Sequence, residues 1–219
     1  MDLYLVRHGE TKANARRIYQ EPNEPLSMRG AAEVAQLTAA VREIQPTHLY
    51  TSYFDRARYS AHYFSYATGL EAQWLPFAHE LYRPEDLYGA PLFSIDSAKY
   101  VLSWFFGTLK PKPDSKVETR EQFLARIEEA RTFFESHDSD ARIVLVTHSI
   151  FINFFVGQMC SDSMPGLIRA GGRLINIFRL ENTGLTHVRF QPQDGKKVCA
   201  WQLVSFNSHD HLEPLVKEE

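Results

Sequence analysis

The chain has 219 residues, of which 44% are hydrophobic and 23% are charged, a balance typical of a soluble globular protein. This length fits one domain with a substantial core, and no stretch has the composition of a linker between two domains. The formal net charge of −3 provides no basic field, which argues against a nucleic-acid partner. Any site for an anion must therefore be built locally from individual arginines.

The two cysteines, Cys160 and Cys199, lie far apart in the sequence and have no CxxC spacing. We expect reduced, buried thiols in a cytoplasmic protein rather than a disulfide or a metal pair. The N-terminus has no basic region, and its apolar stretch is too short for a signal peptide. The longest mostly apolar run, 150–160, is well short of a membrane span, so we expect no membrane contact.

Short apolar runs alternate with amphipathic segments along most of the chain. The runs typical of strands are 3–6, 48–51, 72–75, 142–147, 174–180, 185–190 and 198–206. Helical spacing predicts helices from the N-cap Ser27 to Pro46, over 55–68, 96–106 and 119–136, and from Ser149 onward. Hairpin turns are predicted at Asn182-Thr183-Gly184 and Asp194-Gly195. This alternation predicts an α/β fold with a mainly parallel sheet and antiparallel edge strands at the end of the chain.

Polar side chains collect where four predicted strands end. Arg7 and His8 follow the first strand, Arg56 opens the helix after the second, Glu80 follows the third, and His148 follows the fourth. In an open α/β sheet, sites form where strands end and helices begin. We therefore expect these five side chains to meet at one edge of the sheet.

Five stretches in the same order resemble motifs of the histidine phosphatase superfamily, which is also called phosphoglycerate-mutase-like. They are LVRHGETKAN at 5–14, Leu26-Ser27-x-x-Gly30, Thr51-Ser52-x-x-x-Arg56-Ala57-x-x-Ser60-Ala61, Val146-Thr147-His148 and Phe206-Asn207-x-x-x-His211-Leu212. The resemblance implies a three-layer α/β/α fold in one domain over 1–219, with a small cap at about 79–118. It also implies the phosphatase branch: metal-independent hydrolysis of a phosphomonoester, similar to a histidine acid phosphatase. In that reaction His8 forms a phosphohistidine, which water hydrolyses.

The residues themselves suit this chemistry. A phosphoryl group in transfer spreads negative charge over three oxygens, so catalysis depends on positioning and electrostatic stabilisation. Arg7 and Arg56 can each grip two of these oxygens with a planar guanidinium group. A neutral imidazole near pH 7 is a nucleophile, which is the role predicted for His8. His148, if protonated, adds a cationic donor.

Four further residues complete the predicted site. Asn14 can donate a neutral hydrogen bond to the substrate, and the N–H groups at Ser149 open a helix whose positive end favours an anion. Gly9 lets the backbone approach His8 closely. Glu80 is the candidate proton donor to the leaving alcohol, with Glu85 and Asp86 as alternatives.

Two other functions fit the same residues less well. A mutase would transfer phosphate within a phosphoglycerate-type acid, but the cap lacks the adjacent arginine pair that the resemblance leads us to expect of those enzymes. The aromatic residues of the cap could face a ring-bearing alcohol, although packing of the cap is the favoured interpretation. A non-catalytic binder of phosphorylated ligands would be expected to lack one of the site residues, and none is missing. We expect no metal or cofactor and a small phosphomonoester as substrate; a homodimer is an option that the sequence leaves open.

Overall fold

In the computed structural model of the protein, the described residues are 1–160, 180–192 and 199–212. They form one six-stranded sheet in the order β3-β2-β4-β1-β5-β6. Its strands are β1 (Asp2–Arg7), β2 (His48–Thr51), β3 (Gln73–Trp74), β4 (Arg142–Thr147), β5 (Leu185–Phe190) and β6 (Trp201–Ser208). The strands β1 to β4 pair with one another in parallel. The last two are antiparallel: β5 pairs with β1, and β6 pairs with β5. The predicted sheet is confirmed.

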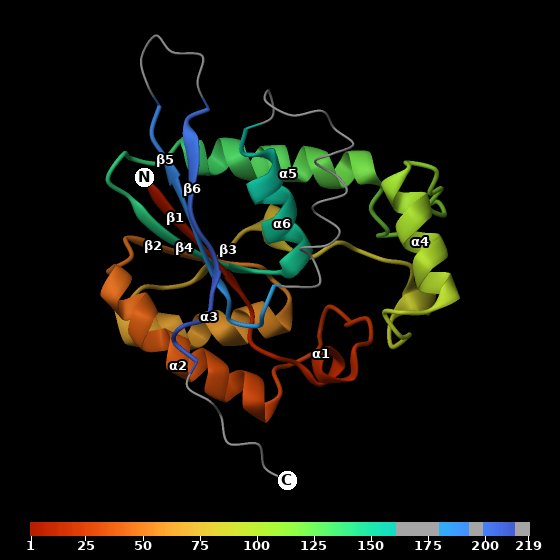
Figure 1. Cartoon of the computed structure of the whole chain (residues 1–219), viewed down its shortest axis with the longest axis horizontal. Coiled ribbons are helices and arrows are strands. Elements are labelled where there is room, and N and C mark those ends of the chain that lie inside the picture. The colour runs from red at the N-terminus through yellow and green to blue at the C-terminus, as the bar shows by residue number, and fades with distance from the viewer. Residues whose placement is uncertain (161–179, 193–198, 213–219) are drawn as a thin grey trace.

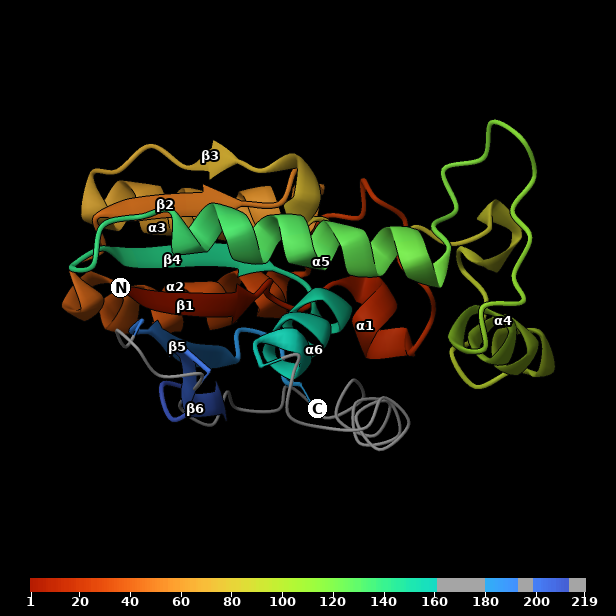
Figure 2. The same cartoon turned by 90° about the horizontal axis from the view of Figure 1, so that it is seen from above.

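Helices cover both faces of this sheet. The described helices are α1 (Lys12–Arg16), α2 (Met28–Ile44), α3 (Asp55–Thr68), α4 (Ile95–Phe105), α5 (Arg120–Glu135) and α6 (Ser149–Gln158), with short 3-10 turns η1 (Pro76–Ala78) and η2 (Glu85–Leu87). Figure 1 shows α2 and α3 on one side of the strands and α5 and α6 on the other. Figure 2 shows α4 beyond the end of the sheet, away from the stacked layers.

The alternation of side chains along the central strands builds two cores. Odd-numbered apolar residues of β1 and β4 pack with α5 and α6, and even-numbered ones pack with α2 and α3. The first set is Leu3, Leu5, Ile143 and Leu145, and the second is Val6, Val144 and Val146. Because both faces are buried, the two strands read as continuous apolar runs rather than as alternating ones.

Local signals set the ends of the helices where the sequence predicts them. The Ser27 hydroxyl accepts a hydrogen bond from the Gly30 N–H at the start of α2. Thr119 and Gln122 form a capping box at the start of α5. Gly69 ends α3 with φ of 73°, a conformation that costs glycine nothing.

The cap segment is joined to the loop that follows α1. Tyr19 donates its N–H to the Ala90 carbonyl and accepts a hydrogen bond from the Gly89 N–H. Its hydroxyl lies 2.5 Å from that of Ser97 on α4. Tyr100 and Trp104, on the buried side of α4, belong to the same hydrophobic cluster as α5 and α6. The cap therefore packs on the larger of the two cores.

Four sequence predictions differ from the structure or lie outside it. The third strand is only two residues long, Gln73 and Trp74, although the Leu75 N–H still donates to the Thr51 carbonyl at 2.9 Å. The last strand begins at Trp201 rather than at Val198. The predicted strand 174–180, apart from Leu180, and the turn Asp194-Gly195 lie outside the described residues.

The prediction of reduced thiols is wrong, because Cys160 and Cys199 form a disulfide with their Cα atoms 5.4 Å apart. Cys160 follows the end of α6, and Cys199 lies just before β6. The end of α6 packs on the start of β6 through the rings of Phe155 and Trp201, so residues 39 positions apart in sequence become neighbours. Sequence spacing alone could not show this. Within the described ranges, no helix combines the length and apolar character needed to cross a membrane.

The disulfide should stabilise the fold measurably. Closing a loop of this length removes entropy from the unfolded chain worth about 3–4 kcal/mol. We expect dithiothreitol to lower the free energy of unfolding by up to this amount in a denaturant titration. The double variant Cys160→Ser/Cys199→Ser should be as unstable as the reduced protein and should not respond to the reductant. Two free thiols in the unreduced protein, detected by alkylation and mass spectrometry, would contradict the pairing.

Candidate active site

Three parallel strands end at the same edge of the sheet. Arg7 pairs with Thr147, and Thr51 pairs with Val146, so β1, β2 and β4 finish in register. The next residue on each strand is therefore brought to one place: His8, Ser52 and His148. The predicted convergence is the direct result of this register.

The His8 ring is fixed by partners on both nitrogens. Its Nδ1 lies 2.7 Å from the Gly9 carbonyl oxygen, and its Nε2 lies 3.2 Å from Nε of Arg56. A guanidinium group can only donate, so Nε2 must be the acceptor. It follows that Nδ1 carries the proton and donates a hydrogen bond to the Gly9 carbonyl oxygen. Nε2 then holds a free electron pair and faces the arginine.

The surroundings also keep this ring neutral. His8 is only 2% exposed, and burial, followed by the charges of Arg56 and Arg7, holds its pKa well below the ordinary value. The hydrogen bond to the Gly9 carbonyl opposes this shift only in part. A neutral imidazole at pH 7 is the form that a nucleophile needs.

The two arginines approach the same space from different elements. Arg56, on the first turn of α3, donates from Nη1 to the Glu21 carbonyl at 2.8 Å and lies over the Phe54 ring at 4.9 Å. Burial lowers the pKa of Arg56 to about 10, so it stays charged at neutral pH. Arg7, at the end of β1, donates to the Leu180 carbonyl. Burial lowers the pKa of Arg7 as well, opposed chiefly by Glu80.

His148 lies beside His8 rather than on the surface of the site. The two ring centroids are 5.1 Å apart, and His148 is fully buried with Nε2 2.8 Å from the Ser52 hydroxyl. Among the described atoms, its Nδ1 is buried without a hydrogen-bond partner. Burial and the nearby charge of Arg56 hold its pKa well below the ordinary value. The predicted cationic donor is therefore neutral in this state of the site.

A cavity of about 400 Å³ opens above His8. Six predicted residues line it: Arg7, His8, Asn14, Arg56, Glu80 and Ser149. Gly9 and His148 are buried and are not among the described residues that line it. The cap contributes Arg83, Tyr100 and Trp104 to the rest of the lining, so the aromatic residues both pack the cap and face the cavity.

Glu80 is fixed by two backbone donors. Its Oε1 accepts from the Leu81 N–H at 3.0 Å, and its Oε2 accepts from the Ile150 N–H at 3.2 Å. The second donor belongs to the first turn of α6, so the start of this helix holds Glu80. The alternative acids, Glu85 and Asp86, are exposed on η2 and are not among the described residues that line the cavity.

Two glycines allow α2 to press against the loop after β1. A Cβ atom on Gly9 would lie 2.5 Å from the Gly30 carbonyl oxygen, and one on Gly30 would lie 2.0 Å from that of Glu10. Both glycines belong to the motifs quoted above, and close packing is the reason for their residue type. The Gly9 N–H is also held by the Ser60 hydroxyl at 3.1 Å. The backbone that carries His8 is thereby fixed from two helices.

Sequence reasoning missed Asn182, for which only a hairpin turn was predicted. Its Nδ2 donates to the His8 carbonyl at 3.0 Å and lies 3.2 Å from Oδ1 of Asn14. The adjacent Thr183 N–H donates to the Arg7 carbonyl. His211, from the closing motif, lies 3.3 Å from the Thr183 hydroxyl. Residues 182, 183 and 211 therefore help to hold the backbone at Arg7 and His8.

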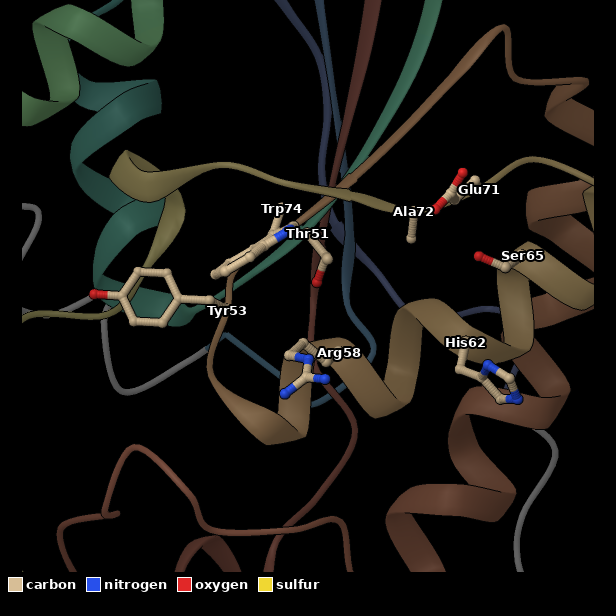
Figure 3. Close-up of a pocket in the computed structure, with 8 residues that line it drawn as sticks. All are labelled: Thr51, Tyr53, Arg58, His62, Ser65, Glu71, Ala72 and Trp74. Carbon is tan, nitrogen blue, oxygen red and sulfur yellow. The ribbon is translucent and has the colours of Figure 1, made fainter.

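A larger hollow of about 640 Å³ lies elsewhere, against α3 and the edge of the sheet. Figure 3 shows Trp74 and Tyr53 near one end of it, Arg58 below them and His62 farther along α3. None of the described residues that line it was predicted to take part in phosphoryl chemistry. Its larger volume does not make it the catalytic site, since it contains no residue at the ends of β1 or β4.

Comparison with known proteins agrees with this geometry. The sequence pattern of the histidine phosphatase superfamily (branch 1) matches residues 3–203. The chain belongs to this superfamily. It is 26% identical over 224 residues, covering 100% of this chain and 98% of the relative, to a probable phosphoglycerate mutase GpmB of Klebsiella pneumoniae.

Solved structures of other histidine phosphatase folds superpose on most of the chain. A mutant phosphoserine phosphatase of Entamoeba histolytica, in complex with phosphoserine, gives a TM-score of 0.75 at 20% identity, covering 97% of this chain and 99% of that one. A mycobacterial glucosyl-3-phosphoglycerate phosphatase complexed with VO3 gives 0.74 at 21% identity, covering 94% and 99%. At these identities the likeness establishes the fold, which agrees with the three-layer fold implied by the motifs.

The buried neutral histidines of this superfamily member should make the fold sensitive to acid. Below the unfolded pKa of about 6.5, the unfolded chain binds protons on His8 and His148 that the folded protein does not. The stabilisation is therefore complete above that pH and is lost as the pH falls, by up to about 1.4 kcal/mol per pH unit for each histidine. Denaturant unfolding of His148→Asn between pH 7 and pH 5 should show a slope smaller by that amount. His62→Asn, at an exposed histidine, should keep the wild-type slope; an equal slope in both variants would refute the assignment.

Proposed function

We propose that the protein hydrolyses small phosphomonoesters without a metal, through a phosphohistidine on His8. The observation that carries this proposal is the His8 ring: its Nε2 accepts from Arg56 beside a cavity that His8, Arg7 and Arg56 line together. Its proton is held on Nδ1 by the Gly9 carbonyl. The described arginines that line the cavity and can meet a phosphate are Arg7, Arg17, Arg56 and Arg83.

In the first step, Nε2 attacks phosphorus and forms an N–P bond while the bond to the ester oxygen breaks. Arg7 and Arg56 neutralise the charge on the phosphoryl oxygens, and Arg56 exchanges its hydrogen bond with His8 for one to the substrate. Glu80, which takes up a proton from solvent as the phosphate dianion binds, donates it to the departing oxygen, which leaves as an alcohol. The enzyme then holds a phosphohistidine and a Glu80 carboxylate.

In the second step, water replaces the alcohol. Glu80 takes a proton from the water as its oxygen attacks phosphorus and the N–P bond breaks. Inorganic phosphate leaves, and His8 and Glu80 return to their starting forms. Three groups around the phosphoryl site assist both steps: the Nδ2 donor of Asn14, the N–H at Ser149, and His148, which the substrate dianion favours in its protonated form.

The walls of the cavity suggest the alcohol half of the substrate. Arg83 is half-buried, lies over the Tyr19 ring at 4.9 Å and forms no ion pair with a carboxylate among the described residues. We propose that it meets a second anionic group, while Tyr100 and Trp104 meet a short apolar portion. The Entamoeba relative is in complex with phosphoserine, and the mycobacterial one is a phosphatase of glucosyl-3-phosphoglycerate; both compounds carry a carboxyl group.

The runner-up function is that of a mutase, which the name of the Klebsiella relative favours. It would use the same phosphohistidine but return the phosphate to its product instead of to water. Such an enzyme would depend on a bisphosphorylated primer and would turn over simple aryl phosphates poorly. We favour the hydrolase because the cap has no adjacent arginine pair.

Replacement of the nucleophile should abolish turnover. We expect His8→Ala to lower kcat/KM on 4-nitrophenyl phosphate by about 10³-fold or more, because no other group in the site can form the intermediate. The wild-type enzyme should retain its activity after treatment with EDTA. Rapid acid-free quenching should trap a phosphoenzyme that is labile to acid and stable to base. Activity that survives His8→Ala, or that disappears with the chelator, would overturn the proposal.

The proton donor can be identified by changing the leaving group. An alkyl phosphate needs a proton on its departing oxygen, whereas a nitrophenolate leaves without one. We therefore expect Glu80→Gln to lower kcat/KM on an alkyl phosphate by about 10²–10⁴-fold, with a much smaller effect on 4-nitrophenyl phosphate. Glu85→Gln, at an exposed acid of the same segment, should have no effect on either substrate. The reverse pattern would assign the proton transfer to Glu85.

A further inference from the structure

Glu80 lies in a stretch of backbone with little regular structure. The stretch runs from η1 to Tyr82, between the end of the sheet and the cap, and has no strand partner to hold it. The two backbone donors to Glu80 orient its carboxyl group but do not anchor the chain on either side. The accuracy of the proton transfer therefore depends on whatever fixes residues 77–82.

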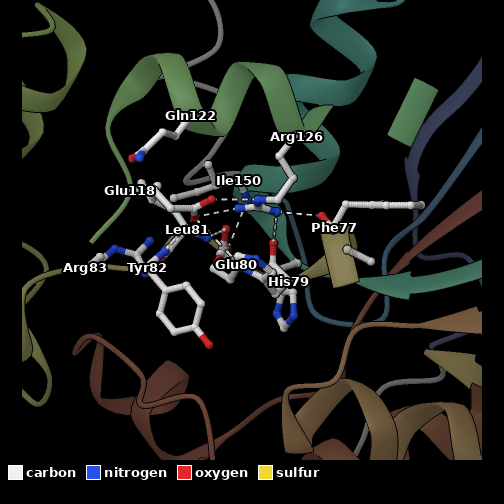
Figure 4. Close-up of polar contacts among 12 residues, drawn as sticks. Phe77, His79, Glu80, Leu81, Tyr82, Arg83, Glu118, Gln122, Arg126 and Ile150 are labelled. Atoms are coloured by element: carbon white, nitrogen blue, oxygen red, sulfur yellow. Dashed lines mark hydrogen bonds and ion pairs between the residues drawn. The ribbon is translucent and has the colours of Figure 1, made fainter. Parts of the chain in front are cut away.

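Arg126 of α5 holds this backbone together with Thr147 of β4, whose hydroxyl donates to the Ala78 carbonyl at 2.6 Å. Nη1 of Arg126 donates to the carbonyl oxygens of Phe77 and His79, both at 2.7 Å. Its remaining donors, Nε and Nη2, bind the two carboxylate oxygens of Glu118 at 2.7 Å each. Figure 4 shows the guanidinium group between Glu118 and these carbonyls, with Glu80 next to them. All three nitrogens of the guanidinium group therefore donate hydrogen bonds.

Glu118 extends the same contact to the other side of Glu80. Its Oε2 accepts a hydrogen bond from the Tyr82 N–H at 3.1 Å, and its own carbonyl accepts from Nε1 of Trp104 at 3.1 Å. The pair thus forms hydrogen bonds with the backbone before Glu80, at Phe77 and His79, and after it, at Tyr82. It also joins this stretch to the cap helix α4.

The pair is largely buried, so forming it requires the removal of both charges from water. The side chains of Arg126 and Glu118 are 9% and 13% exposed, and Arg126 lies over the Phe123 ring at 4.7 Å. Buried ion pairs often contribute little net stability, because removing two charges from water offsets their attraction. A fully hydrogen-bonded pair does, however, fix geometry closely, since each donor has one allowed direction.

We propose that Arg126 and Glu118 are positioning residues for proton transfer by Glu80. They do not touch the substrate; they set the path of the backbone from which Glu80 reaches the leaving oxygen. This inference rests on the role of Glu80 proposed above. It predicts a defect that depends on the leaving group, because a displaced Glu80 matters only for an alcohol that needs its proton.

The test uses Arg126→Lys and Glu118→Gln in the full chain. Lysine keeps the charge but loses the fork, and glutamine keeps the shape but loses the charge. We expect each to lower kcat/KM on an alkyl phosphate by about 10²-fold, as a shift of about 1 Å can, with a change of a few-fold at most on 4-nitrophenyl phosphate. The affinity for inorganic phosphate should not change. If Arg126→Lys fails to fold, Glu118→Gln carries the test.

Two further variants separate the possible outcomes. Arg131→Gln on the same helix, which breaks surface ion pairs with Glu128 and Glu135, should leave both substrates unaffected. In the double variant Glu80→Gln/Arg126→Lys, the alkyl-phosphate defect should be no larger than that of Glu80→Gln alone. Equal losses on both substrates, or additive losses in the double variant, would overturn the positioning role while leaving Glu80 as the donor. A Glu80→Gln variant without leaving-group dependence would overturn both proposals.

Discussion

The site depends on the orientation of one imidazole ring. His8 donates from Nδ1 to its neighbour's carbonyl and accepts at Nε2 from Arg56, so its tautomer, direction and neutral form are all set by two contacts. The same guanidinium that orients the ring also discourages its protonation and can bind the incoming anion. A cation that performs all three tasks must itself be fixed, which the Glu21 carbonyl and the Phe54 ring accomplish.

The rest of the fold can be understood as support for that ring. Parallel strands in register bring His8 and His148 to one edge, and the Gly9–Gly30 contact removes any freedom of the loop that carries His8. The turn at Asn182 closes the site from the antiparallel side of the sheet. His148 and Asn182 each lie more than a hundred residues from His8 in the chain, so the geometry at Nε2 is a property of the whole sheet.

Most of the fold and the central site residues could be predicted from the sequence, because buried parallel strands are apolar and end in charged residues. Contacts made through backbone atoms could not be predicted in this way. Asn182 donates to one backbone carbonyl oxygen, and Arg126 donates to two. Every residue has such an oxygen, so these contacts require no particular residue type at the accepting positions. The disulfide was missed for a related reason, since the pairing of Cys160 with Cys199 depends on where α6 and β6 end.

The electrostatics of the cavity argue for an anionic substrate independently of any motif. Arg56 is buried and Arg7 is half-buried, and the acids that line the cavity with them are the buried Glu80 and the exposed Glu181. Glu33, the other buried acid of the described residues, is already matched by Arg29. Two cations against one buried carboxylate leave an excess positive charge in a place where water screens poorly. Placing arginines there is costly unless an anion completes the site, and a phosphoryl group bound above Nε2 would do so where the nucleophile can use it.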